Sequence, residues 1–493
     1  MATTYKTPGV YIEEISKLPP SVAEVETAIP AFIGYTRNVT HDGQTLTAKP
    51  KRIKSLAEFT EVFGLPRNTE FKTGADNGIK IKKEAGEFKL EGTLNDPFEG
   101  LHYRLYYSLQ LYFANGGGPC YVVSCGQFKN DNSVSDTEME TALNALRKED
   151  EPTIIVFTDA VSLDDKDKYY ALCTKAITQC AELMDRVFIA DVFLDKTKKG
   201  DVPFGDVQAE FRTKIGNNNL SYTAAYYPWL RTSLPCYIDE TEIKIIRGTG
   251  VGANEIKANT VLRKYPAEGS ATLGTADAET SLYHWQSSIY TLIKKELDKF
   301  RIITPPAPLM AGVYATVDSR RGVWKAPANV SLNLVKEPVV KLDDEDQKDM
   351  NVTDSGKSVN AIRLFTGKGV IVWGARTLAG NDNEWRYISV RRFYNMVEES
   401  VKKASEPFVF EPNDKGTWTK VKAMIENYLV LKWRDGALMG AKPDEAFFVH
   451  CGLGETMTAL DIMEGRMIIE IGMAVVRPAE FIILRFSHKM VVS

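Results

Sequence analysis

The chain has 493 residues, of which 44% are hydrophobic and 26% are charged, and its formal net charge is -4. A chain of this length can bury a large core and divide into about two to four domains. The charge balance excludes an electrostatic attraction to nucleic acid or to an anionic membrane. No apolar run approaches the length of a membrane span, and the first residues, MATTYKTPGVYIEE, contain no apolar core of a secretory signal. We therefore expect a protein made in the cytoplasm, and six reduced cysteines, because none form a Cys-x-x-Cys pair.

The N-terminal part predicts two strands separated by an extended linker. Val10, Tyr11, Ile12 and Ile15 follow a Pro-Gly turn signal and read as a short strand. The Pro19-Pro20 pair that follows favours an extended, semi-rigid connection. Residues 29–36 (IPAFIGYT) predict a second, buried strand.

Strand and helix patterns alternate through the middle of the chain. Strands are predicted at 120–124, 152–158, 186–192 and 221–227, and helices at 101–114, 166–184 and 283–300. This alternation is typical of an α/β layer with a largely parallel sheet. Two stretches rich in Gly and charged residues, about 40–100 and 236–275, read as separate surface insertions, and the first holds a helical turn near SLAEFTEVFG.

The pattern changes after an acidic stretch at 341–357. Two strands are predicted around a turn at Gly367-Lys368-Gly369, then a helix whose apolar face holds Phe393, Met396, Val397 and Val401. A second helix, 417–434, carries the stripe Trp418, Val421, Ile425 and Tyr428. The chain closes with two strands broken at Arg477-Pro478, and the last of these, EFIILRFSHKM (480–490), is apolar on both faces.

A search for catalytic and ligand-binding motifs finds none that is specific. The glycine-rich segments 115–119 and 248–252 lack the spacing of a phosphate loop or a dinucleotide fingerprint and read as turns. His450-Cys451 reads as a buried pair at a strand end, and the acidic run 343–346 as a solvated loop. We expect no cofactor and no metal. An α/β enzyme with its active site at the strand ends of the 120–300 region remains the alternative to an assembly protein.

Both ends of the chain resemble contractile tail sheath proteins, the family found in phage tails, tailocins and extracellular contractile injection systems. The N-terminal similarity is carried by TPGVYIEE and AIPAFIGYT. The C-terminal similarity is carried by GVIVWGARTLAG, EWRYISVRRFYNMVEESVKKA, FVFEPND, NYLVLKWRDGALMGAKPDEAFFVHC and GRMIIEIGMAVVRPAEFIILRFS, with SRRGVWKAPAN as a middle element. Little beyond the α/β pattern is similar between about 49 and 299.

The resemblance implies a structural subunit without enzymatic activity. Such subunits polymerise as stacked hexameric rings around an inner tube, and contraction drives the tube through a target cell envelope. The implied partners are further copies of the chain, the tube protein, baseplate and terminal cap proteins, and sheath paralogues. The implied location is a phage tail or tail-like particle assembled in the bacterial cytoplasm. Energy would be stored as the difference between two packings of the same subunits, so no nucleotide site is needed.

The resemblance also implies the domain organisation and two kinds of contact residue. The expected fold class is α+β with an α/β part. Residues 1–36 and 355–493 would form an inner mixed domain with strand-donating arms, and 37–354 an outer α/β domain that carries the insertions. The arms would add strands to a small sheet of neighbouring subunits, a mode known as β-augmentation. From pattern alone, pairing of both end strands within one subunit is equally open. The implied arm residues are Val10, Tyr11, Ile12, Ile15, Phe481, Ile482, Ile483, Leu484 and Phe486.

In this family a helix of the C-terminal domain faces the inner tube. We assign that role to residues 417–436, where Lys420, Lys422, Lys432 and Arg434 outnumber Glu426 and Asp435. The alternative is that these cations form a solvated helix face, since exposed charges usually contribute little.

Overall fold

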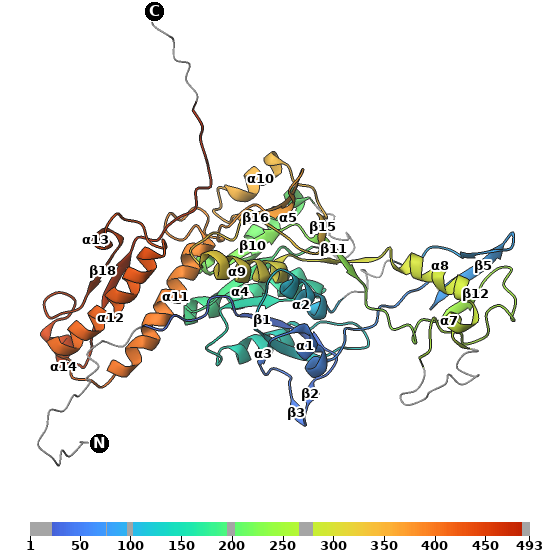
Figure 1. Cartoon of the computed structure of the whole chain (residues 1–493), viewed down its shortest axis with the longest axis horizontal. Helices are drawn as coiled ribbons and strands as arrows, with labels where there is room; N and C mark the ends of the chain where they lie inside the picture. Colours follow the sequence, from blue (N-terminus) through green and yellow to red (C-terminus); the bar gives the residue numbers. More distant parts are fainter. Residues whose placement is uncertain (1–21, 75, 96–101, 195–202, 266–279, 486–493) are drawn as a thin grey trace, which may run out of the picture. The chain divides into compact units, whose positions relative to one another are not determined.

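The computed structural model describes residues 22–74, 76–95, 102–194, 203–265 and 280–485 (Figure 1). The chain forms two compact units. The large unit comprises residues 26–395 and 477–493, and the small unit comprises 1–25 and 396–476. No helix in these described ranges is long and apolar enough to cross a bilayer.

A nine-stranded sheet forms the centre of the large unit, in the order β14-β17-β16-β10-β9-β8-β1-β7-β4. Its middle strands are parallel: β7 (Cys120–Gln127), β1 (Pro30–Thr36), β8 (Ile154–Phe157), β9 (Val187–Asp191), β10 (Thr223–Tyr227) and β16 (Val359–Phe365). Antiparallel strands close both sides: β4 (Lys51–Ile53), β17 (Gly369–Val372) and β14 (Val330–Ser331). The predicted parallel α/β sheet is therefore confirmed.

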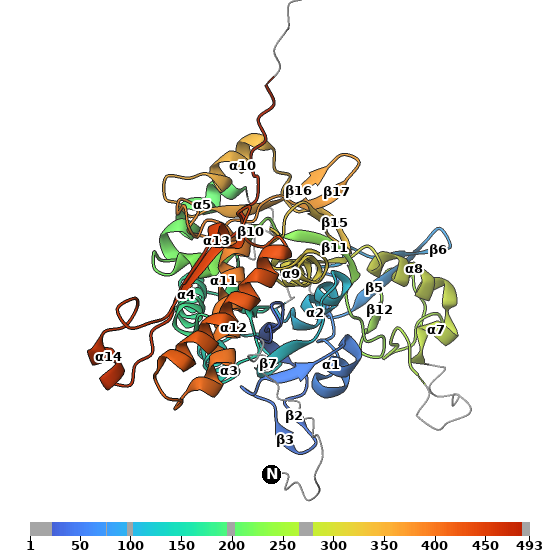
Figure 2. The ribbon, with the colours of Figure 1, turned by 60° about the vertical axis from the view of Figure 1, so that its left-hand side comes forward.

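Helices cover both faces of this sheet. Alternate residues of β1 serve two cores: Ala31 and Ile33 pack with α3 (Asp136–Leu146) and α4 (Lys166–Leu183), and Phe32 packs with α2 (Leu105–Ala114) and α9 (Ala307–Arg321). Figures 1 and 2 both show α2 and α9 side by side. Every residue of β1 is buried, as expected of a parallel strand covered on both faces.

The two predicted insertions meet in one small subdomain. β5 (Ile79–Glu84) pairs with β6 (Glu87–Leu90) and with β12 (Ile245–Arg247) from the second insertion. Helices α7 (Leu282–Trp285) and α8 (Ser287–Leu297) complete a shared core with Ile79 and Ile81. Neither short ribbon could cover its own apolar face, which explains why they associate. The start of the first insertion, β4 and α1 (Leu56–Phe63), belongs to the main sheet and its core instead.

The compact units have other boundaries than the predicted 36/37 and 354/355. β1, β16 and β17 all lie within the nine-stranded sheet, so 26–36 and 355–395 belong to the large unit. The physical reason is that these strands are apolar on faces that only the sheet's two helical layers can cover. The predicted hairpin of β16 and β17 around Gly367-Lys368-Gly369 is confirmed.

The small unit is built from helices and a two-stranded sheet. Helix α11 (Ile388–Ser405) contains the division at 395/396, and α12 (Lys415–Arg434) follows. Asp414 caps α12 by accepting a hydrogen bond from the Thr417 amide at 2.9 Å. Val421, Ile425 and Tyr428 are buried, which confirms three of the four predicted stripe residues, and the fourth, Trp418, is half-buried. The remaining elements are α13 (Pro443–Ala446), β18 (Phe447–His450), α14 (Ala459–Met463) and β19 (Glu470–Met473).

All six cysteines are buried free thiols, as the sequence predicts. Burial raises the pKa of the thiols of Cys120, Cys125, Cys173 and Cys180 well above the ordinary range, so they are protonated core residues.

Candidate functional site

The C-terminal segment has no strand partner among the described residues. A strand is predicted over 480–490, but the described part up to residue 485 contains none. Phe481, Ile482, Ile483 and Leu484 are 67%, 80%, 77% and 72% exposed. Figure 1 shows the segment leaving the large unit near α10 (Asp344–Asn351). A strand exists only when a neighbouring strand shares its backbone hydrogen bonds, and the described part of this chain offers none here. We call residues 481–485 the C-terminal arm.

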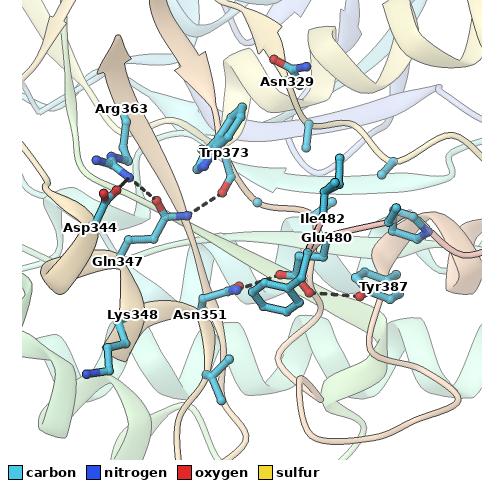
Figure 3. A pocket seen from close by; sticks show the side chains of 18 of the residues that line it. Asn329, Asp344, Gln347, Lys348, Asn351, Arg363, Trp373, Tyr387, Glu480 and Ile482 are labelled. Carbon is cyan, nitrogen blue, oxygen red and sulfur yellow. Dashed lines mark hydrogen bonds and ion pairs between the residues drawn. The ribbon is translucent and has the colours of Figure 1, made fainter. Parts of the chain in front are cut away.

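A single carboxylate fixes the point at which the arm departs. Arg376 donates to Glu480 from Nε at 2.9 Å and from Nη2 at 2.6 Å. Asn351 Nδ2 and the Tyr387 hydroxyl donate to the same carboxylate at 2.7 and 3.0 Å (Figure 3). The Arg376 side chain is 4% exposed and that of Glu480 is 19% exposed. Two-point contact of a guanidinium with a carboxylate sets both position and direction.

The hydrogen bonds also keep Glu480 ionised. Burial by itself raises the pKa of this carboxyl, but donation from Arg376, Asn351 and Tyr387 outweighs burial, so the pKa is below the ordinary glutamate value. The anchor is therefore intact at neutral pH.

A groove of about 800 Å³ lies beside the anchor. Phe481 and Ile482 form part of its wall, and Trp373, Asn329 and α10 form other parts. Arg363 joins Asp344 and Gln347 at 2.7 and 2.8 Å, and Gln347 donates to the Trp373 carbonyl at 2.8 Å (Figure 3). These contacts fix α10 against the β16–β17 hairpin, so the arm begins in a rigid setting.

The small unit contains a sheet that is incomplete. β18 and β19 form an antiparallel ladder from Phe447↔Met473 to His450↔Glu470. Over the described ranges no third strand joins either of them. Val449 is buried, whereas Phe448 is 45% exposed and its ring covers Gly472, where an added Cβ would meet the ring at 2.1 Å. A two-stranded sheet is marginal alone, and its free edges offer unpaired backbone groups to another strand.

The four predicted cations of α12 do not form one surface. Lys420 and Arg434 are exposed and, at 100° per residue, lie within roughly 40° of each other on the helix. Lys422 lies roughly 160° away from Lys420 and is 4.0 Å from Glu426. Lys432 is buried and pairs with Glu24 at 2.5 Å and Asp435 at 3.2 Å. Its helical spacing from Val421, Ile425 and Tyr428 places Lys432 on the buried stripe. That spacing is visible in the sequence and could have predicted the burial of Lys432.

Some predicted positions cannot be compared with the structure. Val10, Tyr11, Ile12, Ile15 and Phe486 lie outside the described residues. At the His450-Cys451 position, Cys451 is buried as predicted, but the His450 side chain is 42% exposed and contacts Glu455 at 2.5 Å. Over the described ranges no group of three or more His, Cys, Asp and Glu side chains is arranged to hold a metal ion.

Two buried carboxyls at strand ends were missed by sequence reasoning. Asp159, just after β8, accepts hydrogen bonds from the backbone amides of Tyr35 at 2.7 Å and Arg104 at 2.6 Å. Asp191, the last residue of β9, accepts one at 2.9 Å from the Ala307 amide at the start of α9. Burial raises the pKa of Asp159 to about 6 and that of Asp191 to about 8. An acidic residue at or next to the end of a buried strand is the sequence signal for both. Their bonds fasten backbone at the edge where the alternative enzyme would place its active site.

The C-terminal region matches a known family. Residues 380–489 match the phage tail sheath C-terminal domain. The chain is 28% identical over 145 residues to the tail sheath protein of Burkholderia phage BcepMu, a stretch covering 28% of this chain and 30% of that protein. It is 25% identical over 150 residues to the tail sheath protein of Enterobacteria phage T4, covering 29% of this chain and 23% of that protein. The aligned part thus spans less than a third of these curated relatives.

Solved structures match over the whole length. The anti-feeding prophage baseplate, solved with 6-fold symmetry, contains a chain 30% identical, with 99% of this chain and 100% of that chain covered and a TM-score of 0.60. The PVC sheath complex of an extracellular contractile injection system, in the contracted state, contains a chain that is 30% identical, with 99% of this chain and 99% of that chain covered and a TM-score of 0.60. The contracted helical sheath of the anti-feeding prophage contains a chain that is 29% identical, with 99% of this chain and 100% of that chain covered and a TM-score of 0.62. These matches confirm the predicted resemblance: the chain belongs to the contractile tail sheath family and is a structural subunit of a contractile sheath.

Proposed function

We propose that this chain polymerises as stacked hexameric rings around an inner tube and that contraction of the polymer drives the tube through a target cell envelope. The proposal is supported by relatives solved as contracted sheaths and within a baseplate. The proposed partners are further copies of the chain, the tube protein, the baseplate and terminal cap proteins, and sheath paralogues.

The observation that carries this proposal is a pair of complementary unfinished elements. Four of the five arm residues, 481–484, are apolar and exposed, and the arm has no strand partner among the described residues. The β18–β19 ladder has edges that no described strand covers. We propose that the arm of one copy, with the N-terminal segment around Val10–Ile15 of another, completes this ladder in a neighbour. Head-to-tail donation of this kind does not close on itself, so it produces a helical polymer.

The two compact units then take different roles. The small unit, which contains the ladder, is the inner part of the sheath, and the large unit with its insertion subdomain is the outer part. The Glu480 anchor holds the arm's root on the rigid large unit, so movement of one copy is passed to the copy that receives its arm.

We further propose that the chain catalyses no reaction. Asp159 and Asp191 are engaged with backbone amides at the strand ends, which supports a structural use of these buried charges rather than the alternative enzyme site. Contraction would draw on the energy difference between two packings of the same subunits.

We propose that α12 contacts the inner tube, as the sequence suggests, but that only two of its four cations take part. Lys420 and Arg434 share one exposed face and would meet an acidic tube surface. Lys422 lies on another flank, and the buried Lys432 is excluded from this contact.

The proposal is tested by placing charge on the arm. In the double variant Ile482→Asp/Leu484→Asp, burial of two carboxylates in a neighbour's sheet would be prohibitive. We expect a folded subunit that forms no extended polymer, as seen by negative-stain electron microscopy and sedimentation. Met184→Asp is the matched control, because Met184 is 53% exposed in the large unit and outside the arm. Normal polymers from the double variant would contradict arm donation.

A further inference from the structure

A tight turn between α11 and α12 places a phenylalanine where glycine is the usual residue. Val409 has φ -65° and ψ 129°, Phe410 has φ 70°, and the Glu411 amide donates to the Phe408 carbonyl at 3.1 Å. This geometry is a type II turn, whose third residue needs positive φ and is normally Gly or Asn. A bulky side chain in this backbone region is strained.

No described residue covers the side chain at this strained position. The Phe410 side chain is 103% exposed, and the neighbouring Val409 is 62% exposed. Among the described non-glycine residues with positive φ, Phe410 is the one aromatic residue, and five of the other nine are Asn or Asp, for which the energetic penalty is smaller. A strained conformation persists only where its surroundings determine it, and strain of this kind is concentrated at functional sites.

The flanking structure holds the turn in place. The Val409 amide donates to the Glu406 carbonyl at 3.1 Å, and Asp414 caps α12 immediately afterwards. Asn413 accepts from the Trp418 indole at 2.6 Å and donates to the Arg466 carbonyl at 3.0 Å. The last of these contacts ties the turn to Arg466, which follows α14. Within α14, Leu460 and Met463 are 56% and 77% exposed.

We propose that Val409 and Phe410 form a preformed knob that inserts into an apolar pocket on a second copy of this chain. The inference rests on the proposed function, because it requires that copies associate. The knob lies within the matched sheath domain and in the same unit as the incomplete ladder, so it extends that interface. Fixing an aromatic anchor before binding lowers the entropy cost of association.

Charge around the knob indicates a copy of the chain rather than the tube. Glu406, Glu411 and Asp414 are exposed next to it, against Lys415. An acidic rim is compatible with a receiving pocket edged by cations. It is incompatible with the acidic tube surface that Lys420 and Arg434 are proposed to meet.

Replacing Phe410 by asparagine distinguishes the backbone strain, which changes the melting temperature, from the contact with a second copy, which changes the critical concentration. In Phe410→Asn the new side chain tolerates positive φ, so we expect the melting temperature of the unassembled subunit to rise by about 2 °C or more. The contact is lost at the same time, so the critical concentration for polymerisation should rise at least about tenfold. Met184→Asn is the matched control: Met184 also has positive φ (59°) and is 53% exposed, but lies at the end of α4. It should raise the melting temperature and leave the critical concentration unchanged.

The outcomes distinguish this inference from the proposed function. If the wild-type chain forms no polymer, both are contradicted. If it polymerises and Phe410→Asn does so at an unchanged critical concentration, or melts at a lower temperature, the knob alone is contradicted. A photo-crosslinking phenylalanine analogue at position 410 identifies the occupant: crosslinked dimers of the chain support the inference, and crosslinks to a tube protein or within one chain overturn it.

Discussion

The large and the small unit differ in how completely they bury their apolar side chains. In the large unit a nine-stranded sheet is covered on both faces by helices, and β1 is buried along its whole length. The small unit covers one face of a two-stranded ladder and leaves the other face and both edges without a further strand from the described chain. Among the described residues, the 81 residues 396–476 carry as many exposed large apolar side chains as residues 26–395: Val409, Phe410, Leu431, Met439, Phe448, Leu453, Leu460, Met463 and Ile468.

This difference teaches that the two units are stable for different reasons. The body of the large unit, residues 26–395, buries enough apolar surface to be complete in one copy, whereas its arm, residues 481–485, does not. The small unit resembles part of an interface, where exposed apolar groups indicate surfaces that association covers. Substitutions in the core of residues 26–395 should therefore change the stability of the isolated subunit, and substitutions of exposed apolar residues in the small unit or in the arm should change assembly.

The largest expected effect on the isolated subunit is loss of a core aromatic residue. Phe32→Ala removes a fully buried ring from the centre of the sheet and should lower the free energy of unfolding by about 3–5 kcal/mol. Phe448→Ala, in the ladder, should cost about 1 kcal/mol or less in the isolated subunit and impair polymerisation instead. Urea unfolding and sedimentation measure the two effects, and equal stability losses would remove the distinction between the units.

The next effect concerns the anchor of the arm. Arg376→Met leaves the largely buried Glu480 carboxylate without its ion pair, and we expect a loss of about 2–3 kcal/mol in the free energy of unfolding. The double variant Arg376→Met/Glu480→Gln removes the charge as well and should recover most of this loss. Failure of the double variant to recover would show that Arg376 acts through packing.

The same pair has a predictable pH dependence. Because the pKa of Glu480 is lowered on folding, its stabilisation is fully present above the unfolded value of about 4.3. It is lost as pH falls through the lower folded pKa. The stabilities of wild type and Arg376→Met should therefore converge as the pH falls below about 4.

A smaller effect of opposite sign is expected at the strand ends. Asp191 has its pKa raised to about 8 by burial, while the unfolded value is about 3.9. This group therefore stabilises fully below pH 3.9 and progressively less as the pH rises toward 8. Asp191→Asn can still accept from the Ala307 amide, so at pH 8 it should be more stable than wild type by at least about 1 kcal/mol.

Asp159→Asn is the control for this experiment. Asp159 accepts two backbone hydrogen bonds, one on each oxygen, and an amide can replace only one of these oxygens. Thermal melts of both variants between pH 4 and 8 give the comparison. A stability difference for Asp191→Asn that does not grow with pH would contradict the role assigned to its titration.

The smallest effect on the subunit itself is expected at the surface of α12. Lys420→Glu/Arg434→Glu should change the free energy of unfolding by less than about 0.5 kcal/mol, because both cations are exposed. In particles it should yield short, contracted sheaths that lack a tube. Lys422→Glu, on another flank, should leave extended, tube-filled particles. Identical particles from both variants in electron microscopy would refute the assignment.

The sequence predicted the parts of the molecule that depend on local pattern. Continuous apolar runs identified β1, β8 and β9, and the helical stripe identified α12. Long-range pairing was not predictable in this way. Ile79 of the first insertion pairs with Ile245 of the second, and Glu480 is 104 residues from Arg376. No periodicity within one segment specifies such partners.

The candidate contacts show the same limit. The Phe410 turn was not predicted, because Phe-Val-Phe-Glu-Pro contains neither the Gly nor the Asn that signals positive φ. Apolar character on both faces identified the arm residues, but whether a strand forms there depends on a partner that one chain does not contain. The sequence therefore shows which segments have apolar surface that their own chain leaves uncovered, but it does not show which segment of another copy covers that surface.

Hydrogen exchange of backbone amides, before and after polymerisation, tests the central claim most directly. Donation of the arm to a neighbour's ladder predicts that the amides of residues 481–485 and of β18 and β19 become strongly protected together in the polymer. The amides of β1, buried in the large unit, should be protected equally in both states. Arm amides that exchange at the same rate in subunit and polymer would contradict the account.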